Sequence, residues 1–360
     1  MAEKVLVAMS GGVDSSVAAY LLQQQGYECI GVTMRLYENE TAGIPRGHTC
    51  CSLDDVEDAR AVAYDLGMPY YVLNFTEEFD EKVIRKFVQV YQNGGTPNPC
   101  IDCNRYLKFD HLLNRARELG CDYIATGHYV QRWQDENGRW GLRKNDDPGK
   151  DQSYVLYSLT QDQLAHTLFP LGGMHKDAVR AIAEEQGLCN ARKHDSQDIC
   201  FVPDGDYAAF LERYTGQPMQ PGNFVDEQGH VIGQHKGAAR YTIGQRKGLG
   251  ISAETRLFVS GKNMAENTVT VGQESALFRS SLLADEWNWI AAPPAVGQPL
   301  PCTARTRYHQ PERPATATLL PDGRVRVDFA APQRAIAPGQ AVVLYNGESV
   351  IGGGTILNVE

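Results

Sequence analysis

The apolar positions of the first two hundred residues alternate between two spacings. Short apolar runs typical of buried strands cover residues 4–9, 29–36, 70–75 and 123–130. Apolar residues recur at helical spacing over residues 13–25, 53–66, 77–91 and 106–119. Strands that alternate with helices in this way predict an α/β fold with a doubly wound parallel sheet, which binds its ligands at the carboxyl ends of the strands.

The pattern changes after about residue 205. Residues 207–214 predict one more short helix, and many glycines and short alternating segments follow it. From residue 274 short strands recur at regular spacing, with hairpin turns predicted at Pro321-Asp322-Gly323 and Asn346-Gly347. We therefore expect an α/β catalytic domain over 1–205, a small basic central domain over 206–273 and a C-terminal β-barrel over 274–360.

The first predicted strand ends in a glycine turn at Ser10-Gly11-Gly12, directly before the first helix. Glycines let backbone N–H groups approach an anion closely, and the helix that follows presents its positive end. The predicted ligand is therefore phosphate, although an ordinary strand-to-helix turn is the alternative. A Walker loop is excluded, because it needs a lysine and none occurs between Lys4 and Lys82.

Residues Ser10–Ser15 match the SGGxDS loop of the ATP pyrophosphatases, and we call them the pyrophosphate loop. The resemblance implies that the loop holds the β,γ-pyrophosphate of ATP and that the enzyme splits ATP between the α and β phosphates to adenylate an acceptor. It also implies that Asp14 assists the Mg²⁺ ion.

Length, apolar content and net charge limit the kind of protein that this chain can be. The chain has 360 residues, of which 42% are hydrophobic, so it is long enough for two or three domains with cores. It contains no apolar run of about 18 residues and no cleavable leader, from which we expect a cytoplasmic protein without a membrane partner. A net charge of -10 argues against a protein that coats nucleic acid indiscriminately.

Two segments are nevertheless basic. Residues 231–250 hold four basic residues and no acid, and residues 301–340 hold six arginines against three acids. The second segment predicts an RNA-binding surface on which Tyr308 stacks with a base. A normally charged barrel surface is the alternative.

Nine cysteines in a chain without an export signal are typical of thiols, metal ligands or catalysts. Cys103 lies just before the predicted helix that ends at Leu119, so the helix dipole predicts a lowered pKa and a nucleophilic thiol. Cys200 lies where a polar segment enters a short apolar run. The adjacent Cys50 and Cys51 are interpreted as structural or zinc-binding thiols.

Blocks along almost the whole chain, in the same order, resemble the bacterial tRNA-specific 2-thiouridylases. Besides the pyrophosphate loop they are Cys50-Cys51-Ser52 with Asp58-Ala59-Arg60, Thr96-Pro97-Asn98-Pro99, Cys103-Asn104, Ala125-Thr126-Gly127-His128-Tyr129, Lys150-Asp151-Gln152-Ser153-Tyr154, Ser196-Gln197-Asp198-Ile199-Cys200-Phe201, Gly233-Gln234-His235 and the ten residues 241–250. Each block alone is a weak or moderate signal, whereas the joint match is highly specific.

The resemblance implies thiolation of the wobble uridine at C2 in tRNAs for Lys, Glu and Gln. ATP would adenylate the C2 oxygen, releasing pyrophosphate and then AMP. The persulfide carrier of the family corresponds to Cys200, which a sulfur-relay protein or a cysteine desulfurase would load. Cys103 corresponds to the second catalytic cysteine, which helps to free the sulfur and ends in a disulfide with Cys200.

The resemblance also implies binding residues. The positions that match nucleotide contacts are Ala8, Met9, Ser10, Gly11, Gly12, Val13, Asp14, Ser15, Met34 and Gly127. Asn98, Pro99 and Cys100 match the segment that meets the target base, which must leave its stack to be reached. The positions that match other tRNA contacts are His128, Lys150, Asp151, Gln152, Arg307, Tyr308 and Gln340. For His128 and Gln340 a structural hydrogen bond is the alternative.

One position departs from the family. Better-known members carry an aspartate assigned to acid/base work where this chain has Cys100, so no carboxylate is available there. Cys100, Cys103 and Cys200 together provide three thiolates, which is enough for a [4Fe-4S] cluster with one open iron. Cluster chemistry is therefore the alternative to persulfide and disulfide chemistry at the same three residues.

Two further classes of protein share part of these signals. Other enzymes with a pyrophosphate loop, such as a tRNA-lysidine ligase, would share the first domain without needing Cys103 and Cys200. A non-enzymatic RNA-binding protein would keep the nucleotide site for regulation and use the cysteines for a structural metal.

Overall fold

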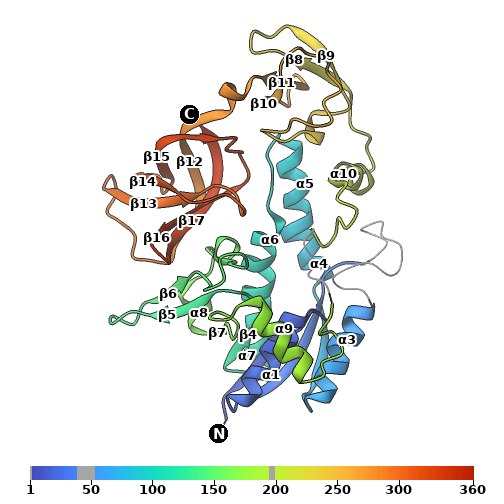
Figure 1. Cartoon of the computed structure of the whole chain (residues 1–360), viewed down its shortest axis with the longest axis vertical. Helices are drawn as coiled ribbons and strands as arrows, with labels where there is room; N and C mark the ends of the chain where they lie inside the picture. The colour runs from blue at the N-terminus through green and yellow to red at the C-terminus, as the bar shows by residue number, and fades with distance from the viewer. Residues whose placement is uncertain (1, 39–52, 194–198) are drawn as a thin grey trace.

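The computed structural model describes residues 2–38, 53–193 and 199–360 of the chain (Figure 1). The predictions for Cys50, Cys51 and the segment 196–198 lie outside these residues. Within the described ranges, no helix has the length and apolar character needed to cross a membrane.

The first half of the chain forms the predicted parallel sheet. Its strand order is β3-β2-β1-β4-β7, from β3 (Tyr70–Asn74), β2 (Glu28–Arg35), β1 (Lys4–Ala8), β4 (Tyr123–Ala125) and β7 (Thr167–Leu168). The pairs β1–β2, β1–β4, β2–β3 and β4–β7 are all parallel. The α/β prediction is confirmed.

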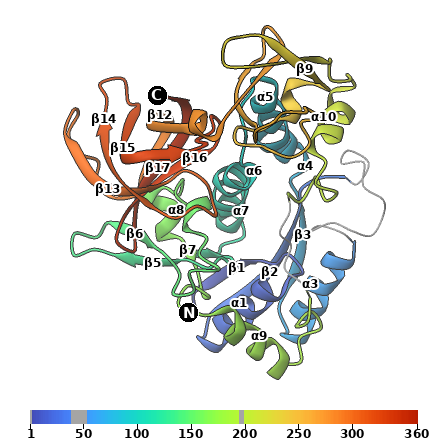
Figure 2. The same cartoon turned by 45° about the horizontal axis from the view of Figure 1, so that its top comes forward.

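Helices cover both faces of this sheet (Figure 2). Val5 and Val7 of β1 pack in one core with α1 (Val13–Gln24), α3 (Leu53–Asp65) and α9 (Lys176–Glu185). Leu6, which points to the opposite face because strand side chains alternate, belongs to a larger core with the helices of residues 76–118. The strand that the pyrophosphate loop follows, β1, is therefore buried on both faces of the sheet.

Two helical runs contain π-helical stretches. The first consists of α4 (Thr76–Phe79), η1 (Asp80–Ile84) and α5 (Arg85–Gln92), and the second of α6 (Pro99–Asp102), η2 (Cys103–His111) and α7 (Leu112–Glu118). The second run begins at Pro99, several residues before the predicted start. Proline fits the first helical position because its missing N–H would have no partner there.

The predicted strand over 123–130 is too long. It ends at Ala125, where pairing with β7 stops, and the chain continues as a loop through Gly127 and His128. The remaining short elements of this half are β5 (Gln131–Gln134), β6 (Trp140–Arg143), η3 (Ser153–Val155) and α8 (Gln161–Ala165).

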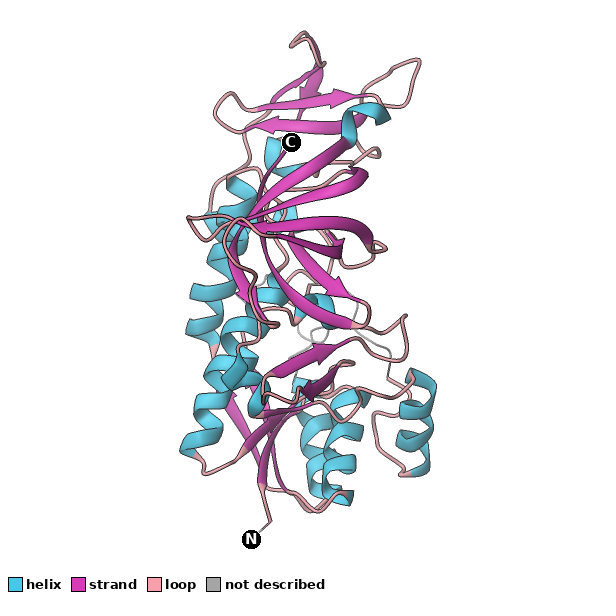
Figure 3. Cartoon of the chain, turned by 90° about the vertical axis from the view of Figure 1, so that its left-hand side faces the viewer, coloured by secondary structure: helices cyan, strands magenta, loops and turns pink. Residues whose placement is uncertain are grey.

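The central segment starts with α10 (Tyr207–Thr215) and forms a small sheet in the order β10-β11-β8-β9. Its strands are β8 (Gly222–Val225), β9 (Val231–His235), β10 (Phe258–Asn263) and β11 (Thr268–Gly272), with η4 (Ala238–Arg240) between β9 and β10. This sheet lies at the end of the molecule opposite the N-terminus (Figure 3).

The last segment is the predicted β-barrel. After η5 (Glu274–Leu277) it consists of β12 (Phe278–Trp289), β13 (Pro299–Arg305), β14 (Arg313–Leu319), β15 (Val325–Arg334), β16 (Ala341–Asn346) and β17 (Ser349–Val359). Pairing of β12 with β17 closes the ring. Both predicted turns are confirmed, since Pro321-Asp322-Gly323 joins β14 to β15 and Asn346-Gly347 joins β16 to β17.

The α/β part and the barrel are continuous with each other. The hairpin of β5 and β6 joins the barrel sheet through Arg143, which pairs with Ser349. Leu6, Tyr154 and Tyr345 also belong to one buried core. The two parts therefore share both a sheet and a core, which the sequence pattern did not predict.

Candidate active site

The pyrophosphate loop lies at the carboxyl end of β1, where parallel sheets bind ligands. Gly11 has a φ of 73°, and a Cβ atom there would collide with the backbone oxygen of Asp55 in α3. The Ser15 hydroxyl accepts a hydrogen bond from the N–H of Ser10 at 3.1 Å and donates one to the Gly12 oxygen at 3.0 Å. These contacts hold the loop in one conformation.

Two other predicted nucleotide positions lie beside the loop. Met34 is buried near the carboxyl end of β2, which pairs with β1. Gly127 approaches so closely that a Cβ atom would lie 2.8 Å from the carbonyl carbon of Asp14 and from the nitrogen of Ser15. Glycine at this position therefore lets the loop after β4 contact the start of α1.

Lys176, the first residue of α9, also contacts the loop, and sequence reasoning did not single it out. Its Nζ lies 2.7 Å and 2.8 Å from the two carboxylate oxygens of Asp14, and the side chain is 8% exposed. The hydroxyl of Tyr129 donates to the same carboxylate at 2.6 Å. No local pattern predicts this contact, because 162 positions separate the two charged residues.

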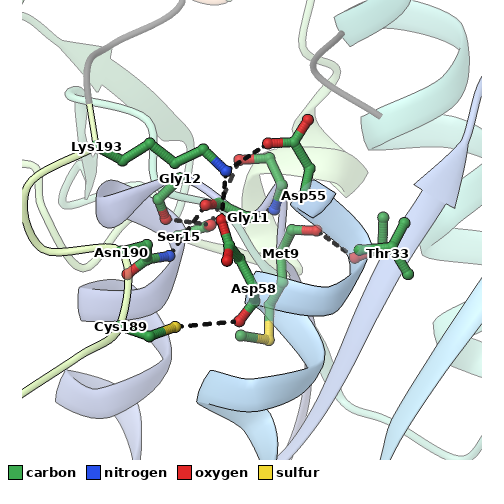
Figure 4. Close-up of polar contacts among 12 residues, drawn as sticks. Met9, Gly11, Gly12, Ser15, Thr33, Asp55, Asp58, Cys189, Asn190 and Lys193 are labelled. Carbon is green, nitrogen blue, oxygen red and sulfur yellow. Dashed lines mark hydrogen bonds and ion pairs between the residues drawn. The ribbon is translucent and has the colours of Figure 1, made fainter. Parts of the chain in front are cut away.

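The segment after α9 adds a second set of polar contacts (Figure 4). Asn190 donates through Nδ2 to the Gly11 oxygen at 3.0 Å and to the Ser16 hydroxyl at 2.9 Å. Lys193 donates to Asp55 and Asp58 of α3 at 2.5 Å each. Burial lowers the pKa of Lys193, but the hydrogen bonds to these two carboxylates outweigh it and the pKa is raised overall.

The prediction of a lowered pKa for Cys103 is wrong. The helical run begins four residues earlier than this cysteine, so Cys103 lies beyond the first turn, where the dipole acts. The residue is only 8% exposed, and burial raises the pKa of its thiol to about 11. Cys100, in the first turn of the run, is exposed.

Cys200 lies in a turn closed by a hydrogen bond from the N–H of Val202 to the oxygen of Ile199. The hydroxyl of Tyr37 donates to its backbone oxygen at 2.7 Å, and the neighbouring Phe201 packs against Phe79. Cys103 belongs to the same core against which the partly buried Cys200 packs. The fold therefore brings these two thiols, distant in the sequence, to one core.

The three thiols do not form a metal site as they are arranged here. Across residues 2–38, 53–193 and 199–360, no group of three or more His, Cys, Asp or Glu side chains is placed to hold a metal ion. The three thiols differ in burial: Cys100 is exposed, Cys103 is buried and Cys200 is intermediate. The residues thus do not fit a [4Fe-4S] cluster in this conformation, and we derive no step through one.

The segment predicted to meet the target base is held by the barrel. Asn98 precedes the first helical position, Pro99 is buried and Cys100 is exposed. Gln340, between β15 and β16, donates to the backbone oxygens of Thr96 at 2.9 Å and Pro97 at 3.3 Å. For Gln340 this is the structural hydrogen bond that the sequence left as an alternative.

His128 likewise has a structural partner. Its Nδ1 lies 2.8 Å from the hydroxyl of Thr126. Burial lowers the pKa of His128 well below its usual value, with a smaller effect from Lys108, so the ring is neutral near pH 7.

Several other expected tRNA contacts are engaged within the protein. The buried Asp151 accepts a hydrogen bond from the Ser153 hydroxyl at 2.9 Å and pairs with Arg305 at 3.4 Å. The hydroxyl of Tyr308 donates to the backbone oxygen of Asp151, and the side chain of Gln152 accepts from the N–H of Tyr129. Arg307 donates to the backbone oxygens of Ile243 and Ala335. Lys150 is partly exposed.

The arginine-rich barrel surface is less positive than its composition suggests. Four of the six arginines have carboxylate partners, namely Arg305 with Asp151 and Glu312, Arg324 with Asp322, Arg326 with Asp328 and Glu360, and Arg334 with Glu274. Part of the predicted basic patch is therefore neutralised by acids close in sequence, such as Asp322 and Asp328, and by acids of other segments, such as Asp151 and Glu274.

Comparisons with known proteins bear on the whole chain. The family described as tRNA methyl transferase HUP domain matches residues 3–204, the tRNA methyl transferase PRC-barrel domain matches residues 208–273, and the aminomethyltransferase beta-barrel domain matches residues 279–356. Among solved structures, the U34-tRNA thiolase NcsA from Methanococcus maripaludis is 19% identical with a TM-score of 0.35 and covers 59% of this chain and 70% of its own.

Curated relatives match over their full length. The tRNA-specific 2-thiouridylase MnmA of Clostridium acetobutylicum is 51% identical over 356 residues, covering 99% of this chain and 100% of its own. The MnmA of Desulforamulus reducens is 52% identical over 356 residues, covering 98% and 97%. Because the match is this high and extends through all three segments, the chain belongs to the tRNA-specific 2-thiouridylase family.

Proposed function

We propose that this protein is an ATP-dependent sulfurtransferase that thiolates the wobble uridine at C2 in tRNAs for Lys, Glu and Gln. The observation that best supports this proposal is the combination of a pyrophosphate loop with two thiols, Cys103 and Cys200, at one core of the same α/β unit. The partners are the tRNA and a sulfur-relay protein or cysteine desulfurase.

The first half-reaction is adenylation. The C2 oxygen of uridine is a poor leaving group. When this oxygen attacks the α-phosphate of ATP, pyrophosphate is released and the oxygen becomes part of a bound AMP group, which is a good leaving group. The N–H groups of the pyrophosphate loop and the start of α1 bind the pyrophosphate. Mg²⁺, which neutralises phosphate charge when bound, would be held by Asp14.

The second half-reaction is sulfur transfer. Cys200 carries the sulfur as a persulfide, Cys200–S–S⁻. The Cys103 thiol attacks the Sγ atom of Cys200 and passes its proton to the departing sulfide, so a Cys103–Cys200 disulfide and HS⁻ are formed. The sulfide then displaces AMP from C2, and a dithiol reductant restores the two thiols.

The buried environment of Cys103 suits this role. Because burial raises the pKa of Cys103 to about 11, the thiol is protonated near pH 7 and must give up its proton as it attacks, since the thiolate is the nucleophilic form. A protonated thiol does not react with stray oxidants and supplies the proton that sulfide needs to leave.

The test is a thiolation assay with purified protein, ATP, a persulfide source and transcripts of the three tRNAs. We expect Cys200→Ser to abolish 2-thiouridine while ATP binding stays within twofold of the wild-type value. Cys302→Ser is the matched control, because Cys302 lies in β13 of the barrel, where its thiol donates to the backbone oxygen of Ala315.

Each alternative predicts a different outcome. Retained thiolation by Cys200→Ser would refute the persulfide role. Binding of tRNA without formation of AMP and pyrophosphate would favour a non-enzymatic RNA-binding protein. Activity that follows the iron content of anaerobically purified protein would favour cluster chemistry at Cys100, Cys103 and Cys200.

A further inference from the structure

Neither the fold nor the proposed sulfur chemistry explains why the ammonium group of Lys176 lies at the pyrophosphate loop. Lys176 is buried, it belongs to α9, and it donates to both carboxylate oxygens of Asp14 inside the pyrophosphate loop. A buried charge requires a partner of opposite sign, and a lysine buried at a ligand loop without a ligand role costs desolvation free energy. The position of Lys176 therefore calls for an explanation.

The charges around the pyrophosphate loop suggest an explanation for the position of Lys176. The triphosphate of ATP carries several negative charges, yet the loop itself contains no lysine or arginine. Around it lie three carboxylates, those of Asp14, Asp55 and Asp58, and the ammonium groups of two lysines. Within the described residues, these pairs place two ammonium groups close to the loop, and phosphates entering it need cations of this kind.

The two lysines differ in their attachment. Lys193 is bound by two carboxylates of α3, neither of which belongs to the loop, and its side chain is 32% exposed. Lys176 is bound by a residue of the loop itself and is four times less exposed, at 8%. Of this pair, Lys176 is therefore the one aimed at the loop.

The backbone around Lys176 is rigid. It is the first residue of α9, whose Val179 and Ala183 pack in the same core as Val17 of α1. The N–H of Lys176 also donates to Asp147 at 3.3 Å. A group on a packed helix keeps its position when a ligand binds, as a binding residue must.

We propose that Lys176 binds the β,γ-phosphates of ATP, replacing from α9 the lysine that a Walker loop carries within itself. Without nucleotide, Asp14 neutralises Lys176 and keeps it directed at the loop. When Mg²⁺ and ATP enter, Lys176 exchanges the carboxylate for phosphate oxygens, and Asp14 is released for the metal ion. This inference extends the nucleotide site of the proposed function, on which it rests.

Ligand binding to the full-length protein tests the inference without any thiolation assay. The ligands are an ATP analogue with a methylene group between the α and β phosphates, pyrophosphate, and AMP, each measured by calorimetry with Mg²⁺. For Lys176→Met we expect the affinity for the analogue and for pyrophosphate to fall by about tenfold to a hundredfold, as for a lost hydrogen bond to a charged group. AMP, which lacks these phosphates, should bind within twofold of the wild type.

Two further variants complete the design. Lys144→Met removes another ion-paired lysine, bound to Glu312 at 2.7 Å with a side chain 15% exposed, and should leave all three affinities unchanged. Asp14→Asn combined with Lys176→Met removes both charges of the pair and so avoids an unpaired carboxylate. If the single variant does not fold, the double variant is compared with Asp14→Asn alone: it should bind AMP equally well and pyrophosphate about tenfold more weakly.

The outcomes separate the two proposals. An equal loss of AMP and analogue affinity in Lys176→Met, or pyrophosphate binding at the wild-type level, would overturn the role of Lys176. Absence of any ATP binding by the wild-type protein would instead refute the proposed function.

Discussion

Cys100 and Cys103 lie about one helical turn apart in different environments. The first is exposed in the initial turn of the helical run, and the second is buried with its pKa raised to about 11. At pH 8 only about one Cys103 side chain in a thousand is therefore a thiolate, and thiolates are the species that alkylating agents attack. The reactivity of the two thiols should differ accordingly.

We predict that iodoacetamide at pH 8 modifies Cys100 at least about tenfold faster than Cys103. Peptide mass spectrometry at successive times measures both rates in one sample. Protein unfolded in guanidinium is the control, and there the two rates should converge. Equal rates in the folded protein would show that burial does not govern Cys103.

Lys262 makes the stability of the folded protein depend on pH. Burial lowers the pKa of Lys262 to about 8, and its ammonium donates to the backbone oxygen of Tyr241 at 2.8 Å. In the unfolded chain the pKa returns to about 10.4, so between these values the unfolded state binds more protons. Lys262 therefore contributes stability that increases as the pH rises from about 8 to about 10.

The comparison of wild type with Lys262→Met isolates this contribution. We expect the difference between their urea midpoints to grow in favour of the wild type between pH 8 and pH 10. Groups whose pKa is raised, such as Cys103, act in the opposite direction but are common to both proteins and cancel. A constant difference across this range would contradict the prediction.

At the scale of elements, the contact between the loop after β4 and the start of α1 depends on one glycine. A methyl group at Gly127 would lie 2.8 Å from two backbone atoms of Asp14 and Ser15, so the pyrophosphate loop or the β4 loop must move. We predict that Gly127→Ala weakens binding of the ATP analogue by about tenfold, measured by calorimetry. Gly261→Ala is the control, because the new methyl group would meet Thr270 at an ordinary 3.5 Å.

At the scale of the molecule, a partly buried ion cluster joins the catalytic part to the barrel. Lys86 of α5 lies 3.1 Å from Asp102 of α6 and 2.9 Å from Glu286 of β12. Burial tends to raise the pKa of Asp102, whereas Lys86 lowers it, and the net shift is upward. Loss of Lys86 would leave the Asp102 carboxyl without its main cation.

We predict that Lys86→Met lowers the free energy of unfolding by about 2 kcal/mol, a value between those of buried and exposed ion pairs. Arg117→Met, which breaks an exposed pair with Asp162, should cost less than about 1 kcal/mol. Urea unfolding followed by tryptophan fluorescence measures both. Asp102→Asn added to Lys86→Met should recover part of the loss, and no recovery would assign the effect to packing of the lysine stem.

The sequence by itself determined the features that depend on neighbours along the chain. Strand and helix periodicity placed β1, α1, β2, α3 and β3 within one or two residues, and turn chemistry placed the hairpins at Asn346 and Pro321. The glycine loop after β1 was predicted correctly because its conformation depends on a few adjacent residues. Resemblance to a family added roles for Cys103 and Cys200 but not their environments.

The tertiary structure alone decided the features that join distant segments. Four features depend on which segments meet in the folded chain. They are the pairing of Lys176 with Asp14, the burial of Cys103, the ion pairs of Arg305 with Asp151 and Arg334 with Glu274, and the hairpin that extends the barrel sheet. Burial and opposite charge act through space, so a pKa such as that of Cys103 follows from the whole core around it and not from its place near a helix end.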